Sequence, residues 1–308
     1  MSRAAAGLAL AAIAAAPPIP GGEPLAAKGP ARLWLGGDVQ MDGRTRGVLA
    51  AIPALVSHAS GIVNLEGPIA AAPVAQPRPR QPLRVINAPM VVAELRAAGV
   101  RVAGIANNHA GDAGPGGVAA TARALREGGV APAGLASGAA VVLVGGLRVA
   151  ITAHDLGAAI PVGLTDELRR ARRDADVLVA TFHVTAPPSY LPTPALEQAV
   201  ERALDAGATV VAAHGTHMLG RVERRGRAVV AWGLGKLAFA CDCTHETEGL
   251  LLEVELGPDG AGAAAVIPIQ AGLAGAPAAA APDPSGIVDL LRALGTRFVQ
   301  VNAGRAQL

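Results

Sequence analysis

The sequence predicts an α/β protein whose strands form two sheet regions. Over residues 32–213, short apolar segments rich in β-branched residues alternate with segments whose apolar residues recur at helical spacing. Such alternation gives largely parallel strands that are buried on both faces. Three later strand-like segments follow one another without a long helix, which indicates a second, more antiparallel group. The 308 residues, 51% of them hydrophobic, are enough to enclose these elements around one sizeable core.

The alternating part contains expected strands and helices in regular order. Apolar β-branched segments predict strands at residues 32–36, 61–65, 100–106, 148–153, 176–182 and 208–213. Helical spacing of apolar residues predicts helices at residues 45–58, 89–98, 117–127, 165–174 and 194–205. The antiparallel group comprises expected strands at residues 227–232, 249–256 and 264–270. A tract rich in Ala and Pro separates that group from a last expected helix at residues 287–294.

The first 31 residues are expected to lie outside the folded domain, which then spans residues 32–308. Arg3 precedes a short stretch of Ala, Leu and Ile, and Ala12-Ile13-Ala14 offers small residues for cleavage, as in a secretory signal peptide. Residues 17–30 hold too much Pro and Gly for a continuous helix or strand and are expected to be a linker. A signal peptide predicts an extracytoplasmic protein of the periplasm or cell envelope. The alternative is an Ala-rich extension on a cytoplasmic protein.

Composition excludes two broad classes of function. The net charge is only +2 and aromatic residues make up 2% of the chain, so no nucleic-acid partner is expected. No run of 18 apolar residues follows the N-terminus, which excludes a multi-pass membrane protein. Cys241 and Cys243 are interpreted as small buried side chains, because two thiols fall short of a zinc site and a disulfide between them closes a strained ring.

Side chains that can bind a metal follow directly on the expected strands. They are Asp38, Glu66, the run Asn107-Asn108-His109, His183 and His214, with His217 in the same loop as His214. The carboxyl ends of the strands form the ligand crevice of an open α/β sheet, so residues far apart in the sequence converge there. Carboxylate, imidazole and amide donors suit Zn, Mn or Fe, and the set lacks the thiolates of a closed structural zinc site. The pattern therefore predicts a metal site suited to hydrolysis.

Each of these motifs, taken alone, also has a structural interpretation. The segment that ends at Asp38 is typical of a strand-to-loop turn, and a lone His183 after an apolar strand is more often a hydrogen-bonded core residue. Four of the seven histidines nevertheless fall at expected strand exits beside two carboxylates, which favours the metal site. His58 and His154 are interpreted as structural, although His154 also follows a strand and is the one that could join the crevice.

A series of longer motifs runs from about Trp34 to Leu256. The pieces are Gly37-Asp38-Val39 with Met41 and Arg44; Asn64-Leu65-Glu66-Gly67-Pro68-Ile69; Ala106-Asn107-Asn108-His109-Ala110 with Asp112; Phe182-His183; His214-Gly215-Thr216-His217; Glu223; and Trp232-Gly233-Leu234-Gly235-Lys236. In this order they resemble the CapA family of poly-γ-glutamate capsule synthesis proteins, whose domain is related to the calcineurin-like metallophosphoesterases. The resemblance implies a two-sheet αββα sandwich of the metallophosphoesterase type.

The resemblance also implies roles for individual residues. The implied metal ligands are Asp38, Glu66, Asn108, His183, His214 and His217, which would hold one or two divalent ions of Mn, Zn or Fe. His109, next to the catalytic Asn108, is implied as the acid that protonates a leaving group, a role that imidazole side chains can fill. Arg44 is a candidate clamp for an anionic substrate; the alternative is a solvated or ion-paired side chain. Asp38-Val39-Gln40 departs from the usual Asp-x-His and lacks a second ligand.

Three functions follow from this resemblance. The first is a metal-dependent hydrolase, acting on a phosphoester or a capsule or envelope polymer. The second is a non-catalytic subunit of capsule assembly, which binds the polymer or the subunits of a membrane capsule synthase. The third is a cytoplasmic housekeeping hydrolase, which differs from the first in keeping residues 1–27. Fold resemblance does not choose among them, because one fold hosts many functions.

Overall fold

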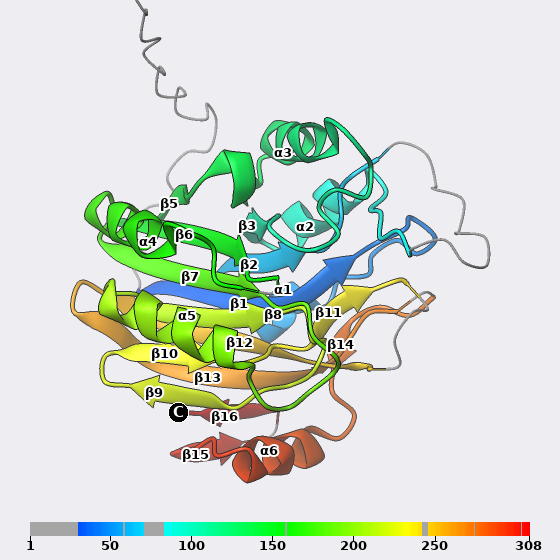
Figure 1. The fold of residues 1–308 in the computed structure, drawn as a ribbon. Helices are drawn as coiled ribbons and strands as arrows, with labels where there is room; N and C mark the ends of the chain where they lie inside the picture. Colours follow the sequence, from blue (N-terminus) through cyan, green and yellow to red (C-terminus); the bar gives the residue numbers. More distant parts are fainter. Residues whose placement is uncertain are drawn as a thin grey trace, which may run out of the picture.

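The computed structural model describes residues 30–57, 59–70, 83–157, 159–241, 246–273, 275–302 and 304–308 (Figure 1). The expected signal peptide and most of the linker lie outside the described residues, as do His58 and Cys243, so their interpretations stay predictions. In the part of the chain that the structure describes, no helix has both the length and the apolar character needed to cross a membrane.

The first sheet combines strands from both ends of the chain. Its strands are β1 (Ala31–Gln40), β2 (Ser60–Leu65), β3 (Val100–Gly104), β4 (Ala131–Ala133), β11 (Lys236–Phe239), β12 (Glu248–Gly257), β13 (Gly260–Gln270), β14 (Ala279–Ala280), β15 (Gln300–Asn302) and β16 (Arg305–Gln307). The order is β15-β16-β13-β12-β1-β2-β3-β4, with β11 also paired with β1 and β14 with β13. Strands β1 to β4 are parallel, whereas β12 runs antiparallel to β1.

The second sheet is built from the middle of the chain. Its strands are β5 (Ala140–Val144), β6 (Leu147–Asp155), β7 (Val177–His183), β8 (Val210–His214), β9 (Val222–Arg225) and β10 (Ala228–Ala231). The order is β5-β6-β7-β8-β10-β9, and the four central strands run parallel to one another. Both edge strands are antiparallel to their neighbours. These central strands are apolar on both faces, as expected for parallel strands that are covered on both sides.

Most helices cover the outer face of one of the sheets, and the last one packs against the apolar cluster between the sheets. They are α1 (Ile52–Leu55), α2 (Val91–Ala97), α3 (Gly117–Glu127), α4 (Leu164–Arg173), α5 (Pro194–Asp205) and α6 (Pro284–Ala293), with a short 3-10 helix at Leu135–Ser137. The first three pack against the first sheet, whereas α4 and α5 pack against the second (Figure 1). A third apolar cluster lies between the two sheets and includes Leu33, Ile62, Val149 and Val179. The predicted two-sheet αββα sandwich is therefore confirmed.

Two sequence-based expectations about the elements are wrong. The expected helix at residues 45–58 is reduced to the single turn of α1, because Gly47 adopts a left-handed φ of +68° and Pro53 is compatible only with a helix that starts just before it. The three late strands do not form a separate antiparallel group. β10 joins the second sheet in parallel with β8, whereas β12 and β13 extend the first sheet from β1.

Strand β1 passes through the centre of the first sheet and bends just before Asp38. Leu33 and Leu35 face the space between the sheets, whereas Trp34 faces the helices, as strand alternation requires. The register with β2 shifts between Leu35 and Asp38, where two glycines lie. A Cβ at Gly37 would lie 2.1 Å from the carbonyl oxygen of Gly235, so only glycine allows β11 to approach here. The bend sets Asp38 at the carboxyl end of the sheet.

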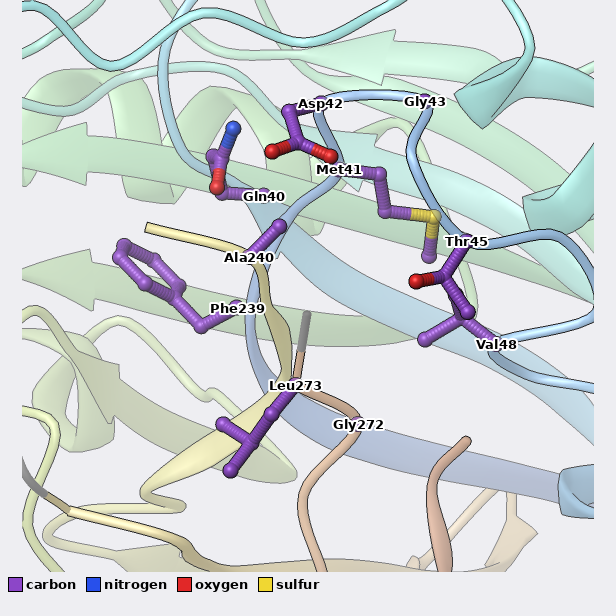
Figure 2. A pocket seen from close by; sticks show the side chains of 10 residues that line it. All are labelled: Gln40, Met41, Asp42, Gly43, Thr45, Val48, Phe239, Ala240, Gly272 and Leu273. Atoms are coloured by element: carbon purple, nitrogen blue, oxygen red, sulfur yellow. The ribbon is translucent and has the colours of Figure 1, made fainter. Parts of the chain in front are cut away.

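A small pocket opens beside the end of β1. Figure 2 shows its lining: Gln40, Met41, Asp42, Gly43, Thr45, Val48, Phe239, Ala240, Gly272 and Leu273. The Gln40 amide nitrogen donates to the carbonyl oxygen of Ile86 at 2.7 Å, while its oxygen is buried without a hydrogen-bond partner. The pocket is therefore largely apolar, with one free amide acceptor in its wall.

Candidate metal centre

Two rows of polar residues end the central strands of the two sheets. In the first sheet Asp38 on β1 is in register with Asn64 on β2. In the second sheet Asp155, His183 and His214 are in register across β6, β7 and β8. Neighbouring strands lie about 4.8 Å apart, so each row brings its side chains into contact range. Because both rows lie at carboxyl ends, they meet at one edge of the sandwich, as the sequence predicts.

Asp38 is a fully buried carboxylate at the centre of this edge. Its Oδ1 accepts a hydrogen bond from Asn64 Nδ2 at 2.8 Å, and its Oδ2 accepts one from the backbone N–H of Gly215 at 3.1 Å. Oδ2 also lies 2.9 Å from Nδ1 of His217, and Oδ1 lies 3.5 Å from Nδ1 of His214. Burial alone would raise the pKa of Asp38, but the two imidazoles outweigh it and hold the pKa well below its ordinary value. Asp38 is therefore ionised.

Glu66 is the second buried carboxylate of the centre, and it behaves in the opposite way. Its side chain lies just after β2, with Oε1 at 4.0 Å from Nε2 of His183 and 3.9 Å from Nε2 of His217. Burial, followed by the negative charge of Asp38, raises its pKa well above the ordinary value, although the charge of Lys236 acts in the other direction. A cation between the two carboxylates would offset their mutual repulsion and act against this rise.

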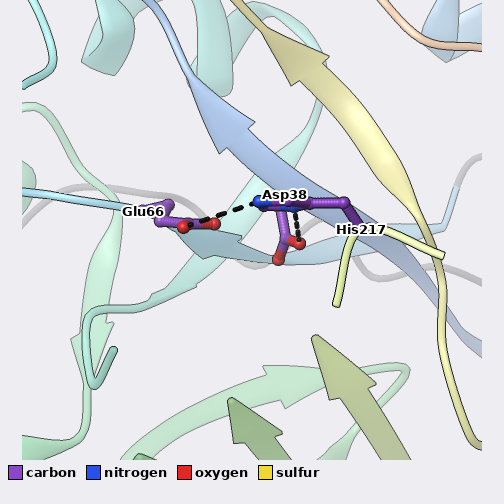
Figure 3. A group of neighbouring side chains, drawn as sticks. All are labelled: Asp38, Glu66 and His217. Carbon is purple, nitrogen blue, oxygen red and sulfur yellow. Dashed lines mark hydrogen bonds and ion pairs between the residues drawn. The ribbon is translucent and has the colours of Figure 1, made fainter. Parts of the chain in front are cut away.

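The donor set fits a divalent metal ion. Asp38, Glu66 and His217 each offer a ligand atom, and these atoms all lie within 4.8 Å of one another (Figure 3). Beside them, Glu66 Oε2, His183 Nε2 and His214 Nδ1 are buried without a hydrogen-bond partner. Buried polar atoms are almost always paired, because an unpaired one costs about 1–3 kcal/mol. Three such atoms at one edge, all of them good ligands for Zn, Mn or Fe, indicate that a cation is their missing partner.

The loop after β8 turns both of its histidines inward. His214 and His217 would project from opposite faces of a straight strand, so the sequence requires a bend between them. Gly215 supplies it with φ +96°, and a Cβ there would lie 2.4 Å from the carbonyl oxygen of Val184. His217 itself has a left-handed φ of +58°, a strained conformation that is found mainly at functional sites. Its ring packs 4.7 Å from that of Phe239.

The two adjacent asparagines have different environments. Asn107 is buried; its Oδ1 accepts a hydrogen bond from the backbone N–H of Gly67, and its Nδ2 donates to Leu65 O at 2.9 Å and Asn64 Oδ1 at 3.2 Å. It thereby fixes the segment that carries Glu66. Asn108 is exposed, and among the described residues no hydrogen bond joins it to the cluster. Its roles as ligand and catalytic residue stay predictions, whereas sequence reasoning missed the supporting role of Asn107.

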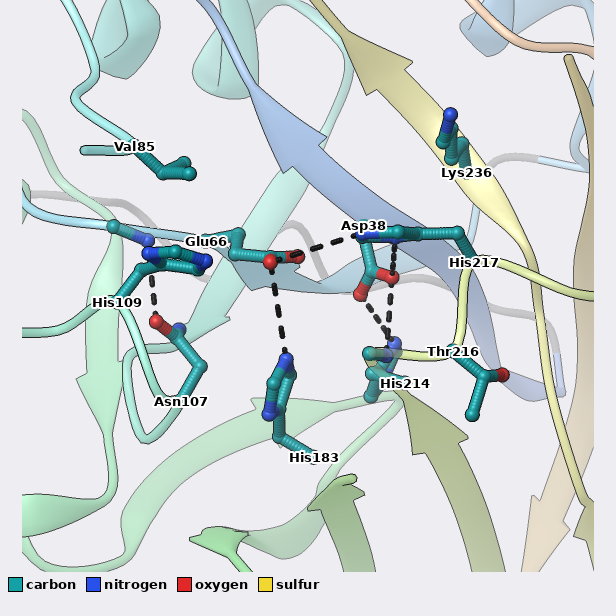
Figure 4. A network of polar contacts seen from close by, with 12 residues as sticks. Asp38, Glu66, Val85, Asn107, His109, His183, His214, Thr216, His217 and Lys236 are labelled. Carbon is teal, nitrogen blue, oxygen red and sulfur yellow. Dashed lines mark hydrogen bonds and ion pairs between the residues drawn. The ribbon is translucent and has the colours of Figure 1, made fainter. Parts of the chain in front are cut away.

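His109 is held by a carboxylate of its own. Its Nδ1 lies 2.8 Å from Oδ2 of Asp112, which also accepts a hydrogen bond from the backbone N–H of Val85 at 2.7 Å. The imidazole is largely buried, with 19% of its side chain exposed. Figure 4 shows His109 together with the candidate ligands at the carboxyl edge. With Nδ1 tied to Asp112, Nε2 is the nitrogen left for proton transfer.

Arg44 does not have the free guanidinium that a substrate clamp needs. Its side chain forms an ion pair with Asp42 and donates from Nη2 to the carbonyl oxygen of Ala240 at 3.0 Å. The side chain is 62% exposed. The structure thus shows the ion-paired alternative, and substrate binding by Arg44 stays a prediction.

A buried lysine lies beside the centre and was noted in the sequence only as part of a motif. Lys236 pairs in register with Asp38, is 1% exposed and donates from Nζ to the carbonyl oxygen of Glu246 at 2.7 Å. Burial lowers its pKa, while the charges of Glu246, Asp38 and Glu66 act to raise it. The charge of Lys236 thus acts against the rise in the pKa of Glu66.

Two further side chains are placed away from the ligands. His154 on β6 lies against α4, with Nδ1 3.6 Å from the Glu167 carboxylate and its ring stacked on Phe182, so the structural interpretation holds and it does not join the crevice. Cys241 is half-buried and disulfide-bonded, so its interpretation as a small buried side chain outside a disulfide is wrong.

Comparisons with known proteins agree with this architecture. A family model described as "Bacterial capsule synthesis protein PGA_cap" matches residues 33–240. A hypothetical protein from Thermus thermophilus superposes with a TM-score of 0.54 at 17% identity, covering 78% of this chain and 99% of that one, which shows a shared fold. Vps29 from Chaetomium thermophilum matches with a TM-score of 0.35 at 12% identity over 78% of this chain and 88% of its own. Among curated proteins no sequence matches.

Proposed function

The chain belongs to the bacterial capsule synthesis protein family PGA_cap, and from this membership and the geometry of its site we propose that it is a metal-dependent hydrolase of the metallophosphoesterase type. The observation that carries the proposal is the group of buried ligand atoms without partners on Glu66, His183 and His214, next to the close set of Asp38, Glu66 and His217. Most buried polar atoms are paired with donors or acceptors of the protein, so three unpaired ligand atoms in one cluster favour a bound ion.

Five side chains would hold the metal, and the chemistry of the donors fits Mn, Zn or Fe. They are Asp38, Glu66, His183, His214 and His217. When bound, one or two such ions would supply a water of pKa about 7 and would polarise the bond to be cleaved. The strands of two sheets fix the donors, so little rearrangement is needed on binding.

His109 is proposed as the group that transfers a proton to the leaving atom. Asp112 fixes its ring through Nδ1, and the backbone N–H of Val85 in turn fixes Asp112. An imidazole oriented in this way can donate from Nε2 near neutral pH, which suits an alkoxide or amine leaving group. The proposed substrate is a phosphoester or amide bond of a capsule or envelope polymer, and residues 1–27 are proposed to direct export to the cell envelope.

The proposal is tested on the purified protein by elemental analysis together with three substrates. They are a phosphodiester, a phosphomonoester and a γ-glutamyl amide, each carrying a chromogenic leaving group. We expect bound Mn, Zn or Fe and turnover of one substrate class. We expect His109→Ala to lose about 10²–10⁴-fold in rate with the metal retained.

Two results would contradict this function. Protein that carries no metal and takes none up on titration would exclude the metal centre. A His109→Ala variant that supports polymer formation in cells as well as the wild type does would exclude a role for turnover. That second result would favour the non-catalytic subunit of capsule assembly instead.

A further inference from the structure

Asp155 is the last residue of β6 and lies outside the group of candidate ligands. It is in register with His183, the last residue of β7, so the two side chains project from adjacent strands on the same face. The ladder continues past them, because the backbone N–H of Leu156 donates to the carbonyl oxygen of His183 at 2.9 Å. The backbone therefore fixes the spacing between the carboxylate and the imidazole.

The carboxylate of Asp155 holds one nitrogen of the His183 ring. Oδ1 lies 3.3 Å from Nδ1 of His183 and also accepts a hydrogen bond from the backbone N–H of Gly157 at 3.2 Å. The His183 side chain is 2% exposed, and its other nitrogen, Nε2, is buried without a partner 4.0 Å from Glu66 Oε1. A carboxylate that accepts from Nδ1–H leaves the lone pair on Nε2. In this arrangement the lone pair faces the candidate ligands.

We propose that Asp155 is a positioning residue of the metal centre, which fixes His183 in the tautomer and ring orientation that present Nε2 to the ion. This inference rests on the proposed metal centre. It is specific to one ligand: His217 is held through Nδ1 by Asp38, itself a candidate ligand, and Nδ1 of His214 has no hydrogen-bond partner. His183 is the candidate histidine ligand that is held by a carboxylate from outside the donor set.

The contacts of Asp155 agree with an acceptor role, because Oδ1 lies within hydrogen-bond distance of Nδ1 of His183 and also accepts from the backbone N–H of Gly157. A carboxylate in this position also makes the imidazole a stronger donor through Nε2.

The test compares metal affinity in two variants of Asp155 with a matched control. Titration of the metal-free protein with Mn²⁺ is expected to give an affinity about 10–100-fold weaker in Asp155→Ala than in the wild type, with Asp155→Asn between them. The control is Asp176→Ala. Asp176 also bridges β6 and β7, but at their amino ends, where its Oδ2 accepts from the backbone N–H of Arg148 at 2.7 Å. We expect its Mn²⁺ affinity to stay within about twofold of wild type.

A second readout does not depend on any metal. Nitrogen NMR of the imidazoles in the metal-free wild type is expected to show His183 as the Nδ1–H tautomer, and Asp155→Ala is expected to show a mixture of both. Equal Mn²⁺ affinity in Asp155→Ala and wild type, or an Nε2–H tautomer in the wild type, would overturn the inference while leaving the metal centre intact. A wild type that binds no metal would instead overturn the proposed function, and the NMR experiment would still decide the role of Asp155.

Discussion

The two sheets contribute to the centre in different ways. The first sheet supplies the charged groups. Asp38 lies near the end of β1 and Glu66 directly follows β2, while the buried ammonium group of Lys236 lies on β11 in register with Asp38. The second sheet supplies imidazole nitrogens, from His183 and His214 at the ends of β7 and β8. Each oxygen of Asp38 already accepts a hydrogen bond, whereas the imidazoles of His183 and His214 each keep a nitrogen without a partner. The first sheet therefore sets the charge of the centre, while both sheets supply ligand atoms without a partner, since Glu66 Oε2 is one of them.

The largest effect on the metal centre is expected from Asp38→Ala. In Asp38→Ala the amide of Asn64 and the N–H of Gly215 both lose their acceptor, and the ion loses a carboxylate of strongly lowered pKa. We expect Mn²⁺ affinity to fall by more than the roughly 100-fold that loss of an outer carboxylate causes. Calorimetric titration measures this loss. Retention of affinity within about tenfold would show that the first sheet does not set the charge of the centre.

Glu66→Gln is expected to change metal affinity and protein stability in opposite directions. Burial raises the pKa of Glu66 above its ordinary value of 4.5. The metal-free folded protein therefore binds a proton on the Glu66 carboxylate more tightly than the unfolded chain does. The resulting stability is fully present below pH 4.5 and is lost as pH rises through the folded pKa. Glutamine does not ionise, so the Glu66→Gln variant does not lose this stability as pH rises.

Metal-free Glu66→Gln is therefore expected to melt about 2 °C or more above the wild type at pH 7, although it binds Mn²⁺ more weakly. The advantage should shrink towards pH 4.5. Melting curves in the presence of a chelator at several pH values check this prediction. A melting temperature below that of wild type at pH 7 would contradict it.

The adjacent asparagines offer a comparison within the first sheet. Asn107→Ala leaves the buried N–H of Gly67 without an acceptor and is expected to lower the free energy of unfolding by about 1–3 kcal/mol. Asn108→Ala, at an exposed position, is expected to stay within about 0.5 kcal/mol. Urea unfolding measures both. If Asn108→Ala also weakens Mn²⁺ binding, its predicted role as a ligand is supported; equal destabilisation by the two variants would refute the structural distinction.

Arg44→Ala is expected to have the smallest effect. Its ion pair with Asp42 is mostly exposed, and such pairs contribute at most about 1 kcal/mol. We expect a change in unfolding free energy below about 0.5 kcal/mol and an unchanged Mn²⁺ affinity. A raised KM with unchanged affinity for Mn²⁺ would show that Arg44 leaves Asp42 to bind substrate, as the sequence suggests.

Most of the fold could be predicted from the sequence, because buried parallel strands have an apolar pattern that is local. The partition of strands between the sheets could not, since β10 and β12 have similar apolar patterns and only their distant partners distinguish them. The expected helix at residues 45–58 failed for a local reason, because a left-handed glycine and a proline fall within a helical apolar pattern.

The candidate site was predictable to the extent that its residues end expected strands. Asp155 was missed because β6 extends two residues beyond its expected end at Ala153. Alternation from Ile151 and Ala153, which face the space between the sheets, puts Asp155 on that same face, and this signal was available. Asn107 and Asn108 are adjacent in one motif, so no periodicity decides which of them is buried.

Phe239 contacts both the candidate metal centre and the small pocket beside the end of β1. One side of its ring supports the imidazole of His217, and the same side chain lines the small pocket next to Gln40. A substitution of Phe239 that widens or narrows the pocket therefore also changes the packing of the candidate ligand His217.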